Sequence, residues 1–295
     1  MVTVEHIVGV WNHLFFEPIP IHSIALFRGL LGCVLLYDAF FILVNVEEYL
    51  GPQGLISYES YSQAARGRVL SLFLYLPPTM TSVYLIMGLH ILTTTFMTIG
   101  LFTPVSTAIT FVTLRSISNR NPLLCNGGDN VAKIMCFYLI FAPSGHAYSL
   151  DEILFYAPHM PNGEYLTQAP WALRLMQIQV SIIYLYAALW KLKGRTYRNG
   201  TALYYALSNH RYRKFSVPQV LSLTPYVQLL TWSTLTFELV LGPGLWIEEF
   251  RCGLIAMGIA FHMTIEYMLN VHLFSWYMIA CLLLFVDPSQ IFNLL

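Results

Sequence analysis

Apolar residues run along this chain in long stretches that short polar segments separate. A helix needs about 20 apolar residues to cross the hydrocarbon core of a membrane. The stretches long enough to be buried in lipid, alone or with their flanking turns, are residues 21–44, 82–102, 105–114, 131–141, 171–192, 220–241, 252–269 and 271–286. The pattern predicts an all-α fold, a polytopic transmembrane helix bundle of about eight spans. No internal repeat or linker interrupts it, so we expect one domain over residues 1–295.

Two further segments mix apolar and polar residues in a way that suits amphipathic helices lying in the membrane interface. Residues 1–20 combine Trp11 with scattered polar side chains, and Trp favours the level of the lipid headgroups. An unstructured terminus explains residues 1–20 equally well. Residues 62–76 carry Arg66 and Arg68 beside a leucine-rich run, which predicts a short interfacial helix there.

Composition supports lipid as the solvent for much of the chain. Hydrophobic residues make up 57% of it and charged residues only 10%, whereas an ordinary soluble domain carries about 25% charged residues. The net charge is zero, so attraction to nucleic acid is not expected. The five cysteines are scattered without CxxC spacing, which indicates neither a disulfide framework nor a thiolate metal site. The N-terminus has no basic region ahead of an apolar run, and we expect no cleavable signal peptide.

The most polar stretch of the chain, residues 115–133, is called the first polar segment below. Its paired glycines allow a tight turn with free backbone N–H groups, a shape that can hold an anion. The candidate substrate-binding residues are Arg115, Arg120, Asn121, Asn126, Gly127 and Gly128, with Asp129 as a candidate catalytic group. The alternative is a capped, charged turn between two helices, in which Asp129 caps the second helix. Spacing alone favours the turn, whereas the density of amides and charges favours the site.

The second polar segment, residues 191–207, begins with Lys191 at the end of an apolar stretch. A lysine partly withdrawn from water loses its proton more readily, because desolvation disfavours the ammonium, and it can then act as a general base. Lys193 follows as a candidate substrate contact. The alternative is a lysine at a helix end whose ammonium reaches into the interface, which is the more common arrangement. We expect the two polar segments to meet at one membrane surface.

Ionisable residues inside the last apolar stretches form a third candidate site. Glu238, His262 and Glu266 lie there, and ionisable groups at membrane depth are candidates for function. His262 and Glu266 are four residues apart and share one helix face. The three side chains fit a proton relay or a buried hydrogen-bonded network. We expect no metal, because nothing in the spacing fixes a coordination geometry.

The distribution of charge predicts which side of the membrane the polar segments face. If the eight spans alternate in direction, all of the 15 Lys and Arg residues except Arg28, Arg174 and Arg251 fall on one side. The positive-inside rule then places both polar segments in the cytoplasm. The inference weakens where basic residues bind an anionic substrate or a lipid headgroup instead of directing insertion.

Four stretches, in this order, resemble one family: RSISNRNPLLCNGGDNV followed by APSGHAYSLD, ALWKLKGRTYRNGTALYYAL, TWSTLTFELVLGP and FHMTIEYMLNVHLFSWYMIACLLLFVDP. They are similar to the HTTM (horizontally transferred transmembrane) domain, the membrane part of vitamin K-dependent gamma-carboxylase, over about residues 20–290. The resemblance implies that Lys191, in the family's Lys-Leu pair, deprotonates a reduced quinone of the vitamin K type. The family's asparagine–histidine pair falls near residues 126–129, where this sequence lacks the histidine. That departure weighs against the glutamate carboxylation step.

The chain resembles the short, membrane-only bacterial members of the family, and we expect no counterpart of the carboxylase's large luminal domain. The resemblance implies an integral protein of the bacterial cell membrane that binds a quinol or lipid. Lys191 would initiate a redox-coupled modification, with Glu238 and His262 lining the cavity. Some short members resemble proteins that help to mature or export a secreted peptide. The alternative is therefore a non-enzymatic membrane factor with a secreted peptide or protein as partner.

A transporter ranks last among the functions, because the sequence shows no repeated halves. The animal carboxylase works on the luminal side, opposite to the side that the charge distribution predicts. Either this member is oriented oppositely, or its basic residues serve chemistry or lipid headgroups.

Overall fold

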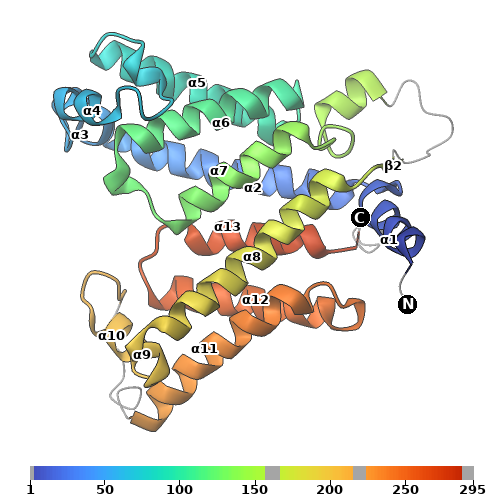
Figure 1. Ribbon diagram of the computed structural model, residues 1–295. Coiled ribbons are helices and arrows are strands. Elements are labelled where there is room, and N and C mark those ends of the chain that lie inside the picture. The colour runs from blue at the N-terminus through green and yellow to red at the C-terminus, as the bar shows by residue number, and fades with distance from the viewer. Residues whose placement is uncertain (1–2, 157–166, 215–223, 288–295) are drawn as a thin grey trace. The chain divides into compact units, whose positions relative to one another are not determined.

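The computed structural model describes residues 3–156, 167–214 and 224–287, which fold almost entirely as helices (Figure 1). The α-helices are α1 (Val4–Phe16), α2 (His22–Val44), α3 (Val46–Leu50), α4 (Tyr58–Ala65), α5 (Met80–Ile99), α6 (Thr103–Arg120), α7 (Gly127–Phe141), α8 (Trp171–Lys193), α9 (Arg195–Arg198), α10 (Ala202–Ser208), α11 (Thr224–Gly244), α12 (Glu248–Met268) and α13 (Phe274–Leu282). Shorter helical turns are η1 (Leu72–Leu74), η2 (Pro122–Leu124), η3 (Glu152–Tyr156) and η6 (Leu283–Phe285). Two short strands, β1 (Ile19–Pro20) and β2 (Thr167–Gln168), pair antiparallel. The predicted all-α fold class is confirmed.

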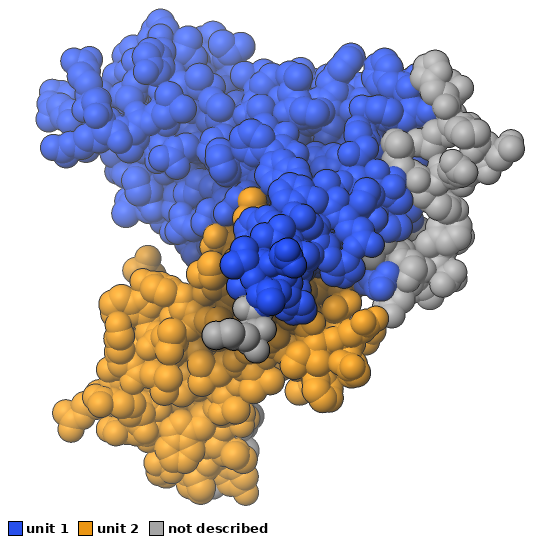
Figure 2. Space-filling view, turned by 45° about the vertical axis from the view of Figure 1, so that its right-hand side comes forward, with its two compact units in different colours: residues 1–174, 287–295 blue, residues 175–286 orange. Residues whose placement is uncertain are grey.

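The chain divides into two compact units (Figure 2). Unit 1 comprises residues 1–174 and 287–295, and unit 2 comprises residues 175–286. The first turn of α8 therefore belongs to unit 1 and the rest of that helix to unit 2. One domain over the whole chain stays a prediction.

Each predicted apolar stretch overlaps a helix, but fewer helices than expected qualify as membrane spans. Among the described residues, α2, α5 and α8 are long and apolar enough to cross a membrane. Helix α7 has only 15 residues, fewer than a straight crossing needs. Helix α6 is long enough, but many Ser and Thr residues make it less apolar. The described part of the chain thus does not confirm the predicted count of about eight spans.

The two segments expected to be interfacial helices differ in outcome. Residues 4–16 form α1, whose N-terminus is capped by the Thr3 side chain. The helix predicted over residues 62–76 is wrong, because α4 ends at Ala65 and the chain turns before η1. Gly67 makes this turn with a φ of 72°, a conformation that glycine adopts at little steric cost. Whether α1 lies in the membrane interface stays a prediction.

Unit 1 contains a series of packed helices, in which α2 contacts α5, α5 contacts α6 and α6 contacts α7. The contact between α5 and α6 is partly polar. His90 Nδ1 hydrogen-bonds to Thr113 Oγ1 at 2.8 Å, and Thr110 Oγ1 donates to Thr93 Oγ1 at 3.2 Å. Thr93 and Thr113 also donate to carbonyls one turn earlier in their own helices, which satisfies the hydroxyls without water. Small polar side chains let membrane helices approach closely, and this contact follows that rule.

Two buried charged residues hold the turn after α7. Arg28 of α2 donates to the carbonyl of Ser144 at 2.7 Å and to that of Tyr148 at 2.6 Å. Asp151 accepts hydrogen bonds from the backbone N–H groups of Phe102 and Thr103 at the start of α6, at 2.8 and 2.7 Å. A carboxylate there is favoured by the unpaired N–H groups and by the helix dipole. The buried Arg28 guanidinium therefore has backbone carbonyls as its hydrogen-bond partners.

Acidification should destabilise this turn through His146. Burial lowers the pKa of the His146 imidazole below its ordinary value of about 6.5, although the charge of Asp151 opposes the shift. The unfolded chain therefore binds the His146 proton more tightly than the folded chain. Above about pH 6.5 the protonation of His146 does not change the free energy of unfolding, and below that pH it lowers this free energy. Between about pH 7.5 and about pH 5.5, we expect the thermal unfolding midpoint to fall further for the wild type than for His146→Gln. An equal fall in both proteins would contradict this role for His146.

Unit 2 packs α11 against α12 and α12 against α13, while α9 and α10 contact α11. The segment after α10 is fixed to the end of α12 by backbone hydrogen bonds. Lys214 N–H donates to Met268 O at 3.1 Å, and Asn270 N–H donates to Tyr212 O. Arg213 and Leu269 form a bridge between these two segments.

Candidate functional site

Arg120, the last residue of α6, binds two backbone carbonyls. Its guanidinium donates to Ile56 O at 2.8 Å and also to Gly51 O, and it lies 5.2 Å from the ring centroid of Tyr61. The residue is 1% exposed. This burial lowers the pKa of the Arg120 guanidinium from its usual range. Arg120 thus fastens the loop between α3 and α4 to α6.

Asn126 and Asp129 form a capping box at the start of α7. The Gly128 N–H donates to Asn126 Oδ1 at 2.6 Å, and the Asn126 N–H donates to Asp129 Oδ2 at 2.6 Å. Gly127 and Gly128 are the first residues of this helix. The turn that the sequence offered as an anion site is therefore a helix start, and the Gly128 N–H is already bonded.

The other residues of the first polar segment differ in their surroundings. Asn121 donates to Tyr49 O at 2.8 Å and accepts from Leu123 N–H at 3.1 Å, while Arg115 is exposed. Burial raises the pKa of the Cys125 thiol, which makes it a poor nucleophile at neutral pH. These contacts fit the capped, charged turn, and a substrate-binding role for the segment stays a prediction.

The second polar segment begins with an ion pair. Lys191 Nζ, near the end of α8, bonds both carboxylate oxygens of Glu238 on α11. The Glu238 side chain is 8% exposed and that of Lys191 is 24% exposed. The Lys191 ammonium also lies 5.8 Å from the ring centroid of Tyr197. Burial raises the pKa of the Tyr197 phenol, and the charge of Glu238 raises it further, so Tyr197 stays protonated at neutral pH. The Lys193 ammonium lies over the ring of Trp190 at 4.3 Å.

The three ionisable residues of the last apolar stretches do not form one cluster. Glu238 is held in the ion pair just described. His262 of α12 hydrogen-bonds through Nε2 to Tyr184 Oη at 2.8 Å, whereas Glu266 pairs with Lys214 at 2.9 Å. No three His, Cys, Asp or Glu side chains come close enough to share a metal ion in the part of the chain that the structure describes. The side chains therefore do not form the single network that their spacing suggested.

Polar side chains along one face of α8 link it to the rest of unit 2. Gln177 donates to Leu284 O at 2.7 Å, and Ser181 donates to Gly242 O at 2.9 Å. Tyr184 and Lys191 follow at helical spacing on the same face and bond to α12 and α11. Gln177, Ser181 and Tyr184 were not among the residues predicted from the sequence. The successive intervals from Gln177 to Ser181, Tyr184 and Lys191 are four, three and seven residues, which place all four side chains on one helix face. This spacing was the signal that could have identified them.

The two polar segments lie in different units, the first in unit 1 and the second in unit 2. Within unit 1, α6 and α7 bring Arg120, Asn121, Asn126 and Asp129 into one region of structural contacts. Within unit 2, α8, α11 and α12 supply Lys191, Glu238 and His262. A meeting of the two segments at one surface stays a prediction.

The chain is a helical membrane protein, and it belongs to the HTTM domain family. The HTTM domain model matches residues 16–289, which include both polar segments and most of both units. The three helices apolar enough to span a membrane agree with this membership. The resemblance inferred from the four sequence stretches is confirmed.

One relative comes from Bacillus subtilis (strain 168), the sporulation-delaying protein SdpB. The two chains are 27% identical over 191 residues, which cover 57% of this chain and 53% of SdpB. This chain thus spans about half the length of that relative in the alignment. No solved structure matches the chain. The likeness agrees with the short bacterial type expected from the sequence.

Proposed function

We propose that this chain is an enzyme of the bacterial cell membrane that binds a reduced quinone or a lipid, with Lys191 as its general base. The observation that carries the proposal is the Lys191–Glu238 pair, in which a partly buried amine and a buried carboxylate from two helices meet. Proton transfer within the pair leaves a neutral amine beside a neutral carboxylic acid. The amine of Lys191 then accepts the hydroxyl proton of the quinol, and a quinolate remains.

His262 supports a binding role for the same part of unit 2. The residue is 2% exposed, and its Nε2 is bonded to Tyr184 Oη. Its Nδ1 has no hydrogen-bond partner among the residues that the structure describes. A buried ring nitrogen without a partner is costly, and a bound hydroxyl or carbonyl would relieve that cost. Asp129 is already committed to the cap of α7, so its catalytic role has the weakest support.

The second candidate is a non-enzymatic membrane factor for the maturation or export of a secreted peptide or protein. Two observations favour it. The chain resembles a protein named sporulation-delaying protein SdpB. Lys191 is held by both oxygens of Glu238, and a buried ion pair between two helices serves structure as readily as chemistry.

The test compares the wild type with Lys191→Arg. An arginine preserves the positive charge and bonds a carboxylate in two places, but it does not give up its proton. Both proteins are purified gently, and reduced quinone is added in air-saturated buffer, so that dissolved oxygen is the oxidant that takes the electrons of the quinolate. The retained molecules and their oxidised products are then measured by mass spectrometry. We expect both proteins to retain quinone and only the wild type to convert it. Equal conversion by both would exclude Lys191 as the base, and bulk phospholipid alone in both would favour the factor.

A further inference from the structure

Unit 2 contains an apolar groove of about 540 Å³ between α10, α11 and α12. Its lining is mostly aliphatic and aromatic and includes Leu207 of α10, Phe237 of α11, and Met257 and Phe261 of α12. The hydroxyls of Ser233, Thr234 and Thr264 each donate to a carbonyl of their own helix. The groove therefore presents hydrocarbon and satisfied hydroxyls to an occupant. Its volume lies within the range of about 300–1,000 Å³ that is usual for small-molecule sites.

One end of this groove carries basic side chains. Met268 and Leu269 line the groove, and the backbone of both is bonded to the segment that follows α10. Lys214 N–H donates to Met268 O, and Arg213 bridges Leu269. Arg211 is exposed two residues before Arg213. The fold thus fixes two arginines next to the place where the groove ends.

The charge of these arginines is not balanced by a neighbouring carboxylate. Lys214 pairs with Glu266, but neither Arg211 nor Arg213 forms an ion pair with any described residue. Arg213 Nη2 lies 2.8 Å from His210 Nδ1. Arginine offers several N–H donors in a fixed plane, which suits the oxygens of a phosphate.

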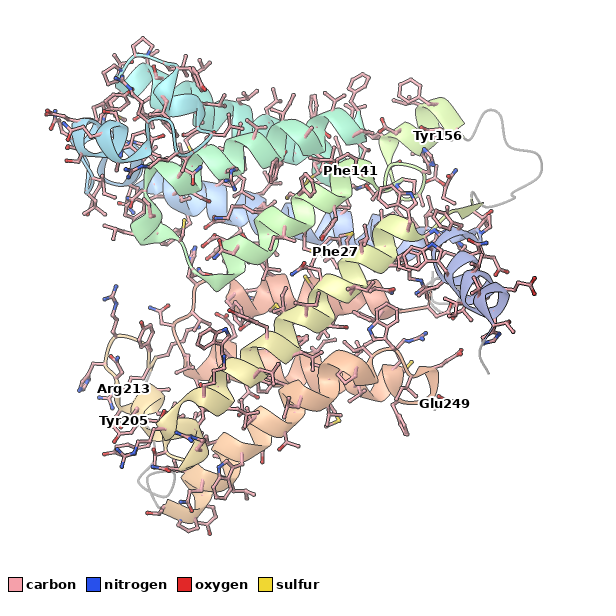
Figure 3. The ribbon with its side chains drawn as sticks, in the orientation of Figure 1. Phe27, Phe141, Tyr156, Tyr205, Arg213 and Glu249 are labelled. Carbon is pink, nitrogen blue, oxygen red and sulfur yellow. The ribbon has the colours of Figure 1, made fainter. Side chains whose placement is uncertain are left out.

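Three exposed tyrosines lie within nine residues of the same arginines in the sequence. Tyr204, Tyr205 and Tyr212 all have exposed side chains. Figure 3 shows Tyr205 and Arg213 at the same end of unit 2. Tyrosine is enriched where a membrane protein meets the lipid headgroups, and basic residues at that level attract anionic lipids. This end of the groove therefore has the composition of the headgroup region, and the groove itself that of the acyl region.

We propose that unit 2 binds an anionic phospholipid, with one hydrocarbon chain in the groove and the phosphate at Arg211 and Arg213. The apolar lining binds the hydrocarbon chain of the lipid, and the two arginines favour a negatively charged headgroup. The site does not use Lys191 or Glu238, so it is independent of the chemistry proposed for that pair. Binding here would account for basic residues that do not serve to direct insertion.

The test uses the delipidated full-length protein in a neutral detergent and measures bound lipid by native mass spectrometry. Phosphatidylglycerol and phosphatidylcholine with identical chains separate the contribution of headgroup charge from that of the chain. The double variant Arg211→Ala with Arg213→Ala should bind phosphatidylglycerol about 25-fold more weakly, since each basic residue near anionic lipid contributes about a factor of five. The matched control, Arg195→Ala with Arg198→Ala, removes the same charge from α9 and should leave binding unchanged.

A second variant tests the groove itself. Ala260 is exposed in the groove wall, so Ala260→Trp fills space without displacing a buried neighbour. We expect it to reduce the binding of both lipids, and Ser233→Trp on the facing helix to do the same. Unchanged phosphatidylglycerol binding in both tryptophan variants would refute the groove as the chain site. Equal losses in the two arginine pairs, or equal binding of the two lipids, would refute the headgroup site. If glycerol phosphate at the same concentration displaces phosphatidylglycerol, the arginines bind phosphate without the acyl chain, and a lipid is refuted as the occupant.

Discussion

Lys191→Ala should destabilise the protein by about 3 kcal/mol, at the lower end of the cost of breaking a buried ion pair. The reason lies in the partner that remains. The Glu238 side chain is 8% exposed and receives its hydrogen bonds from Lys191. Without the ammonium, the carboxylate must stay charged in apolar surroundings or take up a proton, and either change costs free energy.

Removal of the other partner, in Glu238→Ala, should lower the free energy of unfolding by less. Glu238→Ala leaves Lys191, whose side chain is 24% exposed at the end of α8 and can turn its ammonium toward water. We expect a loss of about 1 kcal/mol for this variant. Replacement of both partners, Lys191→Met with Glu238→Leu, should recover most of the stability lost in Lys191→Ala, because no charge is left buried.

Unfolding in detergent at a constant protein concentration measures these differences. Equal losses in Lys191→Ala and Glu238→Ala would contradict the asymmetry, and so would a double variant less stable than Lys191→Ala. Lys191→Ala alone is therefore a poor test of catalysis, because it also destabilises the protein. Activity lost with a broken ion pair does not identify a base, whereas activity lost in Lys191→Arg, which keeps the pair, does.

The helices of this chain could be predicted because their signals are local. Each apolar stretch of the sequence overlaps a helix, and the cap at Asp129 follows from residues only three apart. The failure over residues 62–76 is local as well. Gly67 stands between Arg66 and Arg68, and its positive φ turns the chain directly after α4 ends at Ala65, before the leucine-rich run begins.

The partners of the charged residues could not be predicted in the same way. Lys191 and Glu238 are 47 residues apart, and Lys214 and Glu266 are 52 apart. Which acid meets which base depends on how α8, α10, α11 and α12 pack, and several pairings satisfy the same sequence. The partners of Arg120 are still harder to predict, because they are backbone carbonyls, which every residue carries. The density of charge in the first polar segment suggested a substrate site, which stays a prediction. The contacts that the structure shows there are those of a capped turn.

Arg120→Ala should also cost about 3 kcal/mol, because hydrogen bonds to charged groups contribute about 1.5–3 kcal/mol each and two are lost. The substitution also leaves the carbonyls of Gly51 and Ile56 without the donor that satisfies them. Arg120→Lys should recover only part of the loss, since one ammonium cannot reproduce the planar fork that reaches both carbonyls.

Arg115→Ala is the matched control for this experiment. Arg115 lies on the same helix five residues earlier but is exposed, so its removal should change the free energy of unfolding by less than about 0.5 kcal/mol. The pair also separates a structural role from a substrate role in the first polar segment. If Arg120 fastens the loop between α3 and α4, stability falls in Arg120→Ala with or without ligand. If Arg120 binds substrate instead, the variant keeps the stability of the wild type and loses only ligand binding.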